Sequence, residues 1–441
     1  MTQRAPRLFG SDSHYERWRW QIFAITWLAY FGFYLTRKSF SIVKSTLAKP
    51  EVLDLSNQQM GIIDGSNLAA YAIGMVICGV LGDRLGTRKV ILFGMLGSVA
   101  TAVAMGTSHG FRSLLVWFTL QGLFQSTGWA PLAKNVTAFF SREERGRIMG
   151  FWCTNYALGG FVANLFAGWA AVRFGWQAAF FFPAAALGLI WILFCLFQRN
   201  SPEEVGLPPI EVYHGAEPET APAPSPTAGL VPQETANQTS WRVVLEVLAN
   251  PVVLLLAAIY FCLKPTRYAI LFWGPKYITE RVGSNMAESG FISGMFELAG
   301  PASVIAGGWI SDRVFGSRRM PVSVICLFLL GVLLLCLDRL PHTAWMLGSG
   351  LFLMGFLTYA PDSLVSGTAA VDFGTKRGAS TASGLVNGAG SLGAIVGGTV
   401  PGFFREQWGW QGVFTLLAAA VFLAALMLAP KWNALPKPVG T

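Results

Sequence analysis

Charged side chains are scarce in this chain. They make up 12% of its 441 residues, and 53% of the residues are hydrophobic, whereas a soluble domain carries roughly 25% charged residues. This composition is not typical of a soluble globule. A membrane-spanning helix needs about 20 mostly apolar residues. Twelve such stretches follow one another, centred near Ala29, Ala70, Gly97, Gly122, Gly159, Leu187, Ile259, Ala299, Leu329, Leu353, Ala389 and Leu417. We expect an all-α integral membrane protein.

Histidine and paired cysteine are also lacking where chemistry would need them. The four histidines fall in predicted tails, loops or the central linker, so no span offers one for a metal site or a proton relay. The six cysteines lie in apolar stretches without Cys-x-x-Cys spacing, which is typical of small packing residues. No Walker loop or nucleophile elbow occurs. We expect no enzyme, no metal and no cofactor.

The net charge of +9 is unevenly distributed along the chain. Basic residues crowd the N-terminus and the loops after even-numbered spans, whereas the other loops hold one or two each. Cytoplasmic loops carry such an excess of lysine and arginine. The charge therefore predicts a multi-pass protein of the cell's inner (plasma) membrane with both termini cytoplasmic. It does not predict a nucleic-acid partner.

A linker rich in Pro, Ala and Glu at 199–242 divides the chain into a six-helix half at 1–198 and another at 243–441. The halves repeat each other. The loop motif beginning at Asp83-Arg84 recurs at Asp312-Arg313, an offset of 229 residues, and Arg37 recurs as Arg267, 230 residues on. We expect two pseudo-symmetric six-helix bundles.

The sequence Asp83-Arg84-Leu-Gly-Thr-Arg88-Lys, with its second copy, resembles the signature of the major facilitator superfamily. The resemblance implies a twelve-helix carrier of that fold. The motif aspartates can cap helix ends and pair with loop arginines. The expected gating residues are Asp83, Arg84, Arg88, Asp312 and Arg313.

Two arginines stand inside apolar spans. Each costs about 2.5–3.5 kcal/mol on insertion scales, so Arg37 and Arg267 call for an explanation. First helices of repeated halves face each other near the midplane, and two guanidiniums suit a tetrahedral phosphate. A phosphorylated substrate is the natural inference. The alternative is that each arginine neutralises a buried acid, for which Asp64, Glu297 and Asp362 are the candidates.

Further residues resemble the organophosphate:phosphate antiporter family over the whole chain. The matching segments are Tyr34-Leu-Thr-Arg37-Lys38-Ser-Phe40, Gly128-Trp129-Ala-Pro131, Glu144-Arg145-Gly146, Ser201-Pro-Glu-Glu-Val-Gly-Leu207, Arg267-Tyr268 with Trp273, Phe296-Glu297 and Tyr359-Ala-Pro361. The resemblance implies that Arg37 and Arg267 bind phosphate. It also implies a cavity lined by Tyr34, Lys38, Tyr71, Trp129, Trp152 and Tyr359.

This chain also departs from the family at several places. Met75 replaces the lysine of span two in glycerol-3-phosphate carriers, and Tyr156-Ala157 replaces their His-Asn pair, which puts Tyr156 in the site. The Asp and Lys of span eleven in hexose-6-phosphate carriers are missing, with Ser383 and Val386 in their places.

Two further charged residues lie in the spans near Arg267 and the proline of span ten. Lys264 lies three residues before Arg267, on the same helix face, and could replace the missing positive charge. Asp362 follows the proline of span ten, where relatives carry a neutral residue. It either pairs with Lys264 or reads an amine or hydroxyl of the substrate.

These observations predict a secondary active transporter that exchanges an organic phosphate, of the sugar phosphate or glycerol phosphate class, for inorganic phosphate. Two alternatives stay open. One is a transport-inactive sugar-phosphate sensor, because the family also contains such a receptor. The other is a proton-coupled carrier of organic anions (carboxylates), with Asp64 or Asp362 as the proton site. By analogy with the family we expect a monomer in the lipid bilayer.

Overall fold

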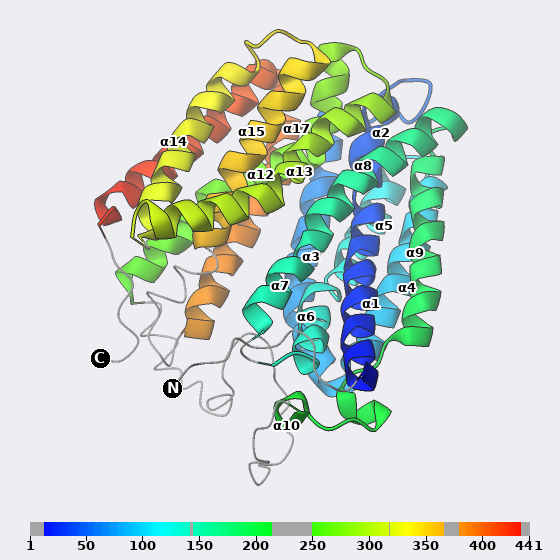
Figure 1. The fold of residues 1–441 in the computed structure, drawn as a ribbon. Helices are drawn as coiled ribbons and strands as arrows, with labels where there is room; N and C mark the ends of the chain where they lie inside the picture. Colours follow the sequence, from blue (N-terminus) through cyan, green and yellow to red (C-terminus); the bar gives the residue numbers. More distant parts are fainter. Residues whose placement is uncertain (1–12, 142–143, 214–248, 317, 366–378, 434–441) are drawn as a thin grey trace.

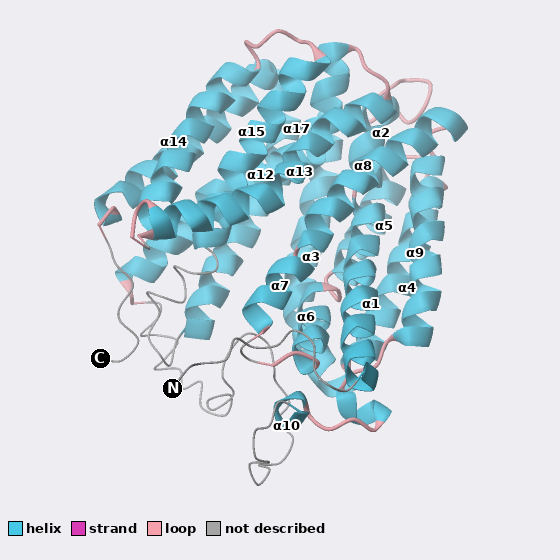
Figure 2. Cartoon of the chain, in the orientation of Figure 1, coloured by secondary structure: helices cyan, strands magenta, loops and turns pink. Residues whose placement is uncertain are grey.

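Every regular element of the described chain is a helix. The computed structural model describes residues 13–141, 144–213, 249–316, 318–365 and 379–433, and within these ranges Figure 2 shows helices joined by short loops. A few side chains inside these ranges are not described, among them those of Asp83, Arg145, Asp312 and 379–383. The expectation of an all-α protein is confirmed for this part of the chain.

The helices of the first half run from the N-terminal region to the start of the linker. They are α1 (Ser13–Arg37), α2 (Ser39–Leu47), α3 (Asn57–Leu85), α4 (Thr87–Gly106), α5 (Phe111–Gln125), α6 (Trp129–Ala138), α7 (Arg145–Trp152), α8 (Thr154–Phe174), α9 (Ala178–Phe197), the 3-10 turn η1 (Pro202–Val205) and α10 (Ile210–Tyr213).

The helices of the second half are longer and less interrupted. They are α12 (Pro251–Val282), α13 (Met286–Arg313), α14 (Arg319–Leu337), α15 (Ala344–Ser363), α17 (Ala379–Leu428) and the 3-10 turn η4 (Ala429–Lys431). The 50-residue α17 consists of two helices joined at Gly409, whose φ of 62° only glycine adopts without strain.

Eight described helical segments are long and apolar enough to cross a membrane. They are Thr87–Gly106, Arg147–Phe174, Ala178–Phe197, Pro251–Val282, Met286–Ser311, Arg319–Leu337, Ala344–Ser363 and Gly384–Lys431. All twelve predicted span centres lie in helices, two of them in α17. Those outside the eight segments belong to α1, α3 and α5. Here α5 has only 15 residues, and α3 buries polar Asp64 and Asn67.

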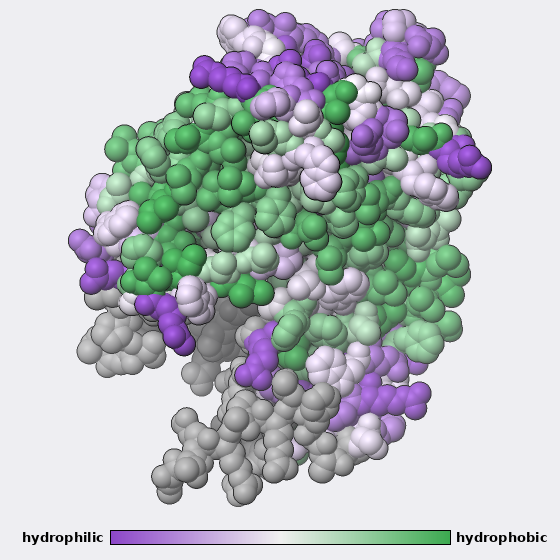
Figure 3. Space-filling model, turned by 45° about the horizontal axis from the view of Figure 1, so that its top comes forward, coloured by the Kyte–Doolittle hydropathy of each residue, from purple (hydrophilic) through white to green (hydrophobic). Residues whose placement is uncertain are grey.

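The surface of these helices is a broad apolar band. Figure 3 shows hydrophobic residues across the middle of one face, with hydrophilic residues gathered towards its two ends. Large side chains such as Ile305, Leu426 and Phe93 are 73%, 71% and 66% exposed. Exposed apolar surface on this scale is typical of a lipid-facing belt.

Helices of the two halves lie on opposite sides of the molecule in Figure 1, with α1–α9 on the right and α12–α17 on the left. The halves touch through α3 with α17, α8 with α13, and α2 with α12. Glycines allow this approach. A Cβ on Gly61 of α3 would lie 2.6 Å from the Thr399 carbonyl oxygen, and one on Gly290 of α13 would lie 2.6 Å from that of Asn164.

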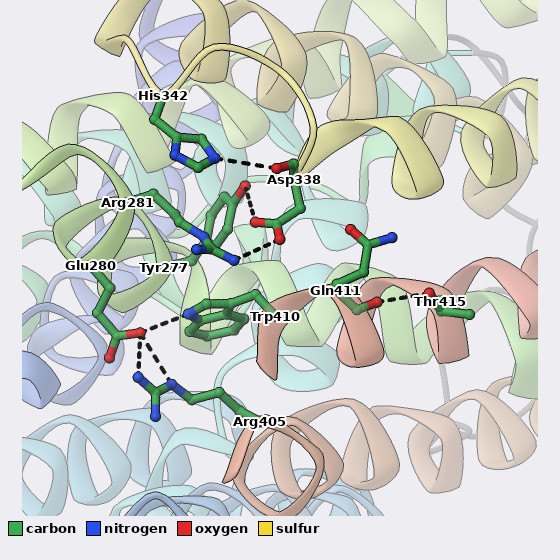
Figure 4. A network of polar contacts seen from close by, with 9 residues as sticks. All are labelled: Tyr277, Glu280, Arg281, Asp338, His342, Arg405, Trp410, Gln411 and Thr415. Carbon is green, nitrogen blue, oxygen red and sulfur yellow. Dashed lines mark hydrogen bonds and ion pairs between the residues drawn. The ribbon is translucent and has the colours of Figure 1, made fainter. Parts of the chain in front are cut away.

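A polar network fastens α12, α14 and α17 together (Figure 4). Arg281 pairs with Asp338 at 2.6 Å. The carboxylate of Glu280 accepts hydrogen bonds from Arg405 at 2.7 Å and from the indole of Trp410 at 2.7 Å. Each of these polar groups thus has a partner, which offsets the cost of removing it from water.

The beginning of the predicted linker packs on the first half. Asn135 donates hydrogen bonds to the carbonyls of Arg199 and Asn200, at 2.8 and 2.9 Å. The ring of Tyr213 stacks on Tyr15 with centroids 4.0 Å apart, and Ile210 is 2% exposed. Residues 199–213 are therefore anchored, while 214–242 of the predicted linker lie outside the described residues.

Candidate functional site

The first span breaks where its two cations stand. α1 ends at Arg37 and α2 begins at Ser39, with the backbone of Lys38 between them still in the α region. Consecutive residues of a helix point about 100° apart, so the side chains of Arg37 and Lys38 face different ways. Interruptions at membrane depth are tolerated where the backbone is buried in protein or lines a cavity. Arg37 and Lys38 are buried, at 7% and 2% exposed. Two cations therefore lie inside the bundle at the junction of α1 and α2.

Arg37 is held within its own half by a neutral partner. Its Nε donates to Gln125 Oε1 at 2.7 Å, and its guanidinium lies 4.6 Å from the ring centre of Tyr34 and 4.8 Å from that of Tyr71. Its Nη2 is buried and has no hydrogen-bond partner among the described residues. A buried guanidinium nitrogen without an acceptor is costly, and an anionic ligand would relieve that cost.

Arg267, on α12, has an acidic partner. Its Nη1 lies 2.7 Å from Oδ2 of Asp362 on α15, whose other oxygen lies 2.9 Å from Nζ of Lys264. The expected pairing of Asp362 with Lys264 is therefore present. All three side chains keep 12–13% exposure, so protein atoms do not enclose the triad completely.

Tyrosines join the two arginines across the halves. The ring of Tyr156, on α8, stacks on that of Tyr359, on α15, with centroids 6.4 Å apart, and also lies 6.4 Å from Tyr34. Arg267 overlies Tyr359 at 4.6 Å and Tyr156 at 5.6 Å. Arg37 and Arg267 therefore bracket one continuous aromatic set, which brings together most of the predicted site.

The two predicted tryptophans differ in exposure. Trp129 is half-buried, and its ring lies 6.4 Å from Tyr156. Trp152 is completely buried against Trp129, and its indole donates to Thr26 Oγ1 at 3.2 Å. Trp152 therefore packs beneath the aromatic set without an exposed surface, and Trp129 is the more exposed of the two tryptophans.

Lys38 crosses to the second half. Its Nζ lies 3.0 Å from Glu297 Oε1 on α13 and donates to the Leu271 carbonyl of α12 at 3.0 Å. Of the candidate acids, Glu297 therefore pairs with Lys38, and Asp362 pairs with Arg267. The alternative that a buried acid neutralises each arginine holds for Arg267. It fails for Arg37, which has no ion pair among the described residues.

The third candidate acid is engaged in a different place. Asp64 of α3 pairs with Lys44 of α2, and both side chains are fully buried. The ammonium of Lys44 also lies 3.8 Å from the ring centre of Trp273, on α12. That indole donates to the Gly398 carbonyl of α17 at 2.8 Å. This pair therefore belongs to the seam between the halves.

The predicted gating residues are only partly described. The side chains of Asp83 and Asp312 lie outside the described set, and those of Arg84 and Arg313 are exposed. Arg88 binds the end of α9: its Nη2 donates to the Cys195 carbonyl, and its backbone N–H donates to Asn200 Oδ1 at 2.9 Å. Its described contacts therefore hold the start of the linker.

The sequence reasoning missed Gln125. This residue donates to Thr36 Oγ1 at 3.1 Å while accepting from Arg37, and one turn earlier Gln121 donates to the Thr36 carbonyl at 3.2 Å. Two glutamines one turn apart in an apolar span are the signal that could have revealed a helix pinning α1.

A cavity opens beside the aromatic set. It encloses about 320 Å³ between α7–α8 and α13 and is lined mainly by apolar atoms. Its walls include Phe151, Thr154, Tyr156, Pro301 and Ile305, with Arg147 among them. Tyr156 is shared by this cavity and the arginine cluster, so the cavity adjoins the site.

Comparison with known proteins gives one family over most of the chain. The family model described as Major Facilitator Superfamily matches residues 26–378. A probable hexose phosphate transport protein of Chlamydia pneumoniae is 30% identical over 429 residues, covering 96% of this chain and 93% of that protein. The glycerol-3-phosphate transporter of Bacillus subtilis is 30% identical over 436 residues, covering 96% and 94%.

Two further similarities concern signalling and fold. The membrane sensor protein UhpC of Escherichia coli is 30% identical over 430 residues, covering 96% of this chain and 94% of that one. The crystal structure of a bacterial homologue of the human lysosomal transporter Spinster superposes with a TM-score of 0.71 at 15% identity. It covers 94% of this chain and 95% of its own.

Proposed function

The chain belongs to the Major Facilitator Superfamily, and from that premise we propose that it is a secondary active transporter for organic phosphates. It exchanges a sugar phosphate or glycerol phosphate for inorganic phosphate by alternating access. Similarity over more than nine-tenths of the chain to a hexose phosphate and a glycerol-3-phosphate transporter supports the substrate class. The chain is proposed to be a carrier and not an enzyme.

The observation that carries this proposal is the buried Nη2 of Arg37, which has no partner among the described residues. Tyr34 and Tyr71 confine the guanidinium, and Gln125 orients it through Nε. A fixed guanidinium with a free nitrogen is pre-organised for a phosphate oxygen. Arg267 supplies the second guanidinium beyond the ring of Tyr156.

Charge explains why such a carrier exchanges its substrates. Two guanidiniums drawn together around an empty site repel each other in a low dielectric. A phosphate dianion between them removes this repulsion, so the loaded carrier closes more easily than the empty one. Return with a second phosphate compound follows, and the cycle needs no ATP or metal.

Alternating access requires contacts between the halves that can open. Lys38 with Glu297, Lys44 with Trp273, and the glycine approaches of α3 to α17 are such contacts. All three join helices of different halves. We propose that they close one end of the substrate path and part when the carrier changes state.

The topology proposed is that of twelve spans in two six-helix bundles, 1–198 and 243–441, joined by a cytoplasmic linker at 199–242. Both termini face the cytoplasm, as the basic loops indicate. The tightly anchored residues 199–213 keep the linker's start on the first bundle. The protein is proposed to act as a monomer in the inner membrane, with no nucleic-acid partner.

The test is exchange in liposomes. Purified protein is reconstituted with unlabelled phosphate inside, and entry of labelled phosphate is compared for wild type, Arg37→Lys and Arg267→Lys. We expect rapid exchange that either substitution reduces at least about a hundredfold, because lysine lacks the planar fork. Absence of exchange by folded wild-type protein, with every phosphate compound tried, overturns the proposal.

A sensor is the second candidate, and the similarity to UhpC favours it. A sensor would bind sugar phosphate through the same arginines without flux. Binding of labelled glucose 6-phosphate by detergent-purified protein, together with no exchange in liposomes, would establish this reading. The carboxylate carrier is less supported, because Asp64 and Asp362 both pair with cations. Phosphate exchange insensitive to an imposed pH gradient would exclude it.

A further inference from the structure

The two arginines of the site are not equivalent. Arg37 offers a buried nitrogen without a partner among the described residues, whereas Nη1 of Arg267 is occupied by Oδ2 of Asp362 at 2.7 Å. We propose that Asp362 is an intramolecular competitor of the substrate phosphate, which holds Arg267 in the empty carrier and is retained by Lys264 when phosphate binds. This inference rests on the proposed phosphate site and adds to it the residue pair that sets its affinity.

The geometry divides one carboxylate between two cations. Oδ2 faces Arg267 and Oδ1 faces Lys264, at 2.7 and 2.9 Å. The cations lie three residues apart on α12, and the acid comes from α15. Tyr260 also hydrogen-bonds the carboxylate. Asp362 is therefore fixed from one side by groups that stay in place when Arg267 changes partner.

The carboxylate occupies a donor that a phosphate would use. A bidentate guanidinium–phosphate contact needs two adjacent N–H groups, and Asp362 accepts from Nη1. A phosphate that binds Arg267 can share Nη1, displace the carboxylate from it, or use Nε and Nη2 beside it. In each case Asp362 stays close to the bound phosphate, so the charge of Asp362 opposes phosphate binding.

The ammonium of Lys264 contacts the carboxylate of Asp362, and we propose that it holds this carboxylate and does not bind phosphate itself. Its ammonium lies 4.6 Å from the ring centre of Tyr260. A Cβ added to Gly390 of α17 would lie 2.4 Å from the ring of Tyr260 and 3.3 Å from Lys264 Cγ. The glycine thus leaves room for Tyr260 against α17, with the stem of Lys264 beside it. With Lys264 present, the displaced Asp362 keeps a cationic partner, which lowers the cost of its release from Arg267.

The experiment measures binding of labelled inorganic phosphate to the purified full-length chain in lipid nanodiscs. We expect Asp362→Asn, which keeps the shape and removes the charge, to tighten phosphate binding about tenfold. Lys264→Met should weaken binding several-fold in the wild-type background, because Asp362 then holds Arg267 alone. The same Lys264→Met change should have no effect in the Asp362→Asn background.

Each other result overturns the inference. Weaker binding by Lys264→Met in both backgrounds would make Lys264 a direct phosphate ligand. Unchanged or weaker phosphate binding by Asp362→Asn would show that Asp362 does not compete with phosphate for Arg267. Asp362→Ala repeats the test without a hydrogen-bonding amide, and size-exclusion profiles identify any variant that fails to fold.

Failure of the proposed function looks different. In that case wild-type protein binds no phosphate, or binds it equally well after Arg37→Lys. If Arg37 matters and Asp362 does not, the phosphate site stands and only the competitor role falls.

Discussion

The ammonium of Lys38 lies 3.0 Å from the carboxylate of Glu297, and this ion pair joins the two halves of the chain. Both side chains are only 2% exposed. One residue away, Arg37 binds Gln125 inside its own half. The two consecutive cations of the first span therefore have different contacts: Arg37, the proposed phosphate ligand, binds within its own half, and Lys38 joins the two halves.

Glu297→Gln is predicted to weaken the contact between the two halves. The substitution leaves the Lys38 ammonium buried without its charge partner, which costs about 3–5 kcal/mol when one member of a buried pair is removed. We expect a lower Tm and slower exchange. Lys38→Met combined with Glu297→Leu should recover most of the stability, because no lone charge is left. A double variant less stable than Glu297→Gln would contradict the role of the pair.

Gln125→Leu should loosen the site without unfolding the protein. The change removes the acceptor for Arg37 Nε, so the guanidinium loses its orientation. We expect the KM for phosphate exchange to rise about tenfold. Gln121→Leu is the matched control, because Gln121 binds the Thr36 carbonyl and not an arginine. Equal effects of the two substitutions would show that Gln125 acts only by supporting α1.

The seam between the halves predicts a steric block at Gly61. A Cβ there would lie 2.6 Å from the Thr399 carbonyl oxygen, so Gly61→Val keeps α3 from approaching α17. We expect exchange to fall at least about tenfold while the protein stays folded. Gly188→Val is the control, because an added Cβ at Gly188 meets nothing within 4 Å. Normal exchange by Gly61→Val would mean that this seam need not close.

Asp64→Asn separates a structural acid from a proton site. Asp64 is fully buried against Lys44, so the substitution strands a buried ammonium and should cost about 3–5 kcal/mol of stability. We expect a lower Tm that Lys44→Met with Asp64→Leu restores. A proton site predicts instead that Asp64→Asn keeps its stability and abolishes the response of transport to a pH gradient. Thermal unfolding and pH-jump transport assays decide between them.

Much of the site could be predicted because single residues in it are unusual for an apolar span. An arginine in an apolar span is expensive, so Arg37 and Arg267 stand out from the sequence alone, and the resemblance to a family added the tyrosines around them. Gln125 gives a weaker signal, because an apolar span tolerates glutamine without a charged partner, even with Gln121 one turn earlier. Its importance depends on α5 lying beside the end of α1.

The buried acids could be recognised from the sequence, whereas most of their partners could not. Asp64, Glu297 and Asp362 are visible in the sequence as acids within apolar stretches. Lys44, Lys38 and Arg267 with Lys264 are their respective partners. The members of the last two sets come from helices far apart in the chain. The sequence suggests pairing of Asp362 with Lys264 as one of two roles, but the choice of Asp362 for Arg267 and of Glu297 for Lys38 depends on which helices pack together.

The sequence by itself determined the membrane setting, the helical class, the repeated halves and the two arginines, because these follow from hydropathy, charge and local spacing. The tertiary structure decided which cation meets which anion. Ion pairing depends on distances of about 3 Å between side chains of different helices, and helix packing alone sets those distances. Asp362 pairs with Arg267 because α15 packs against α12.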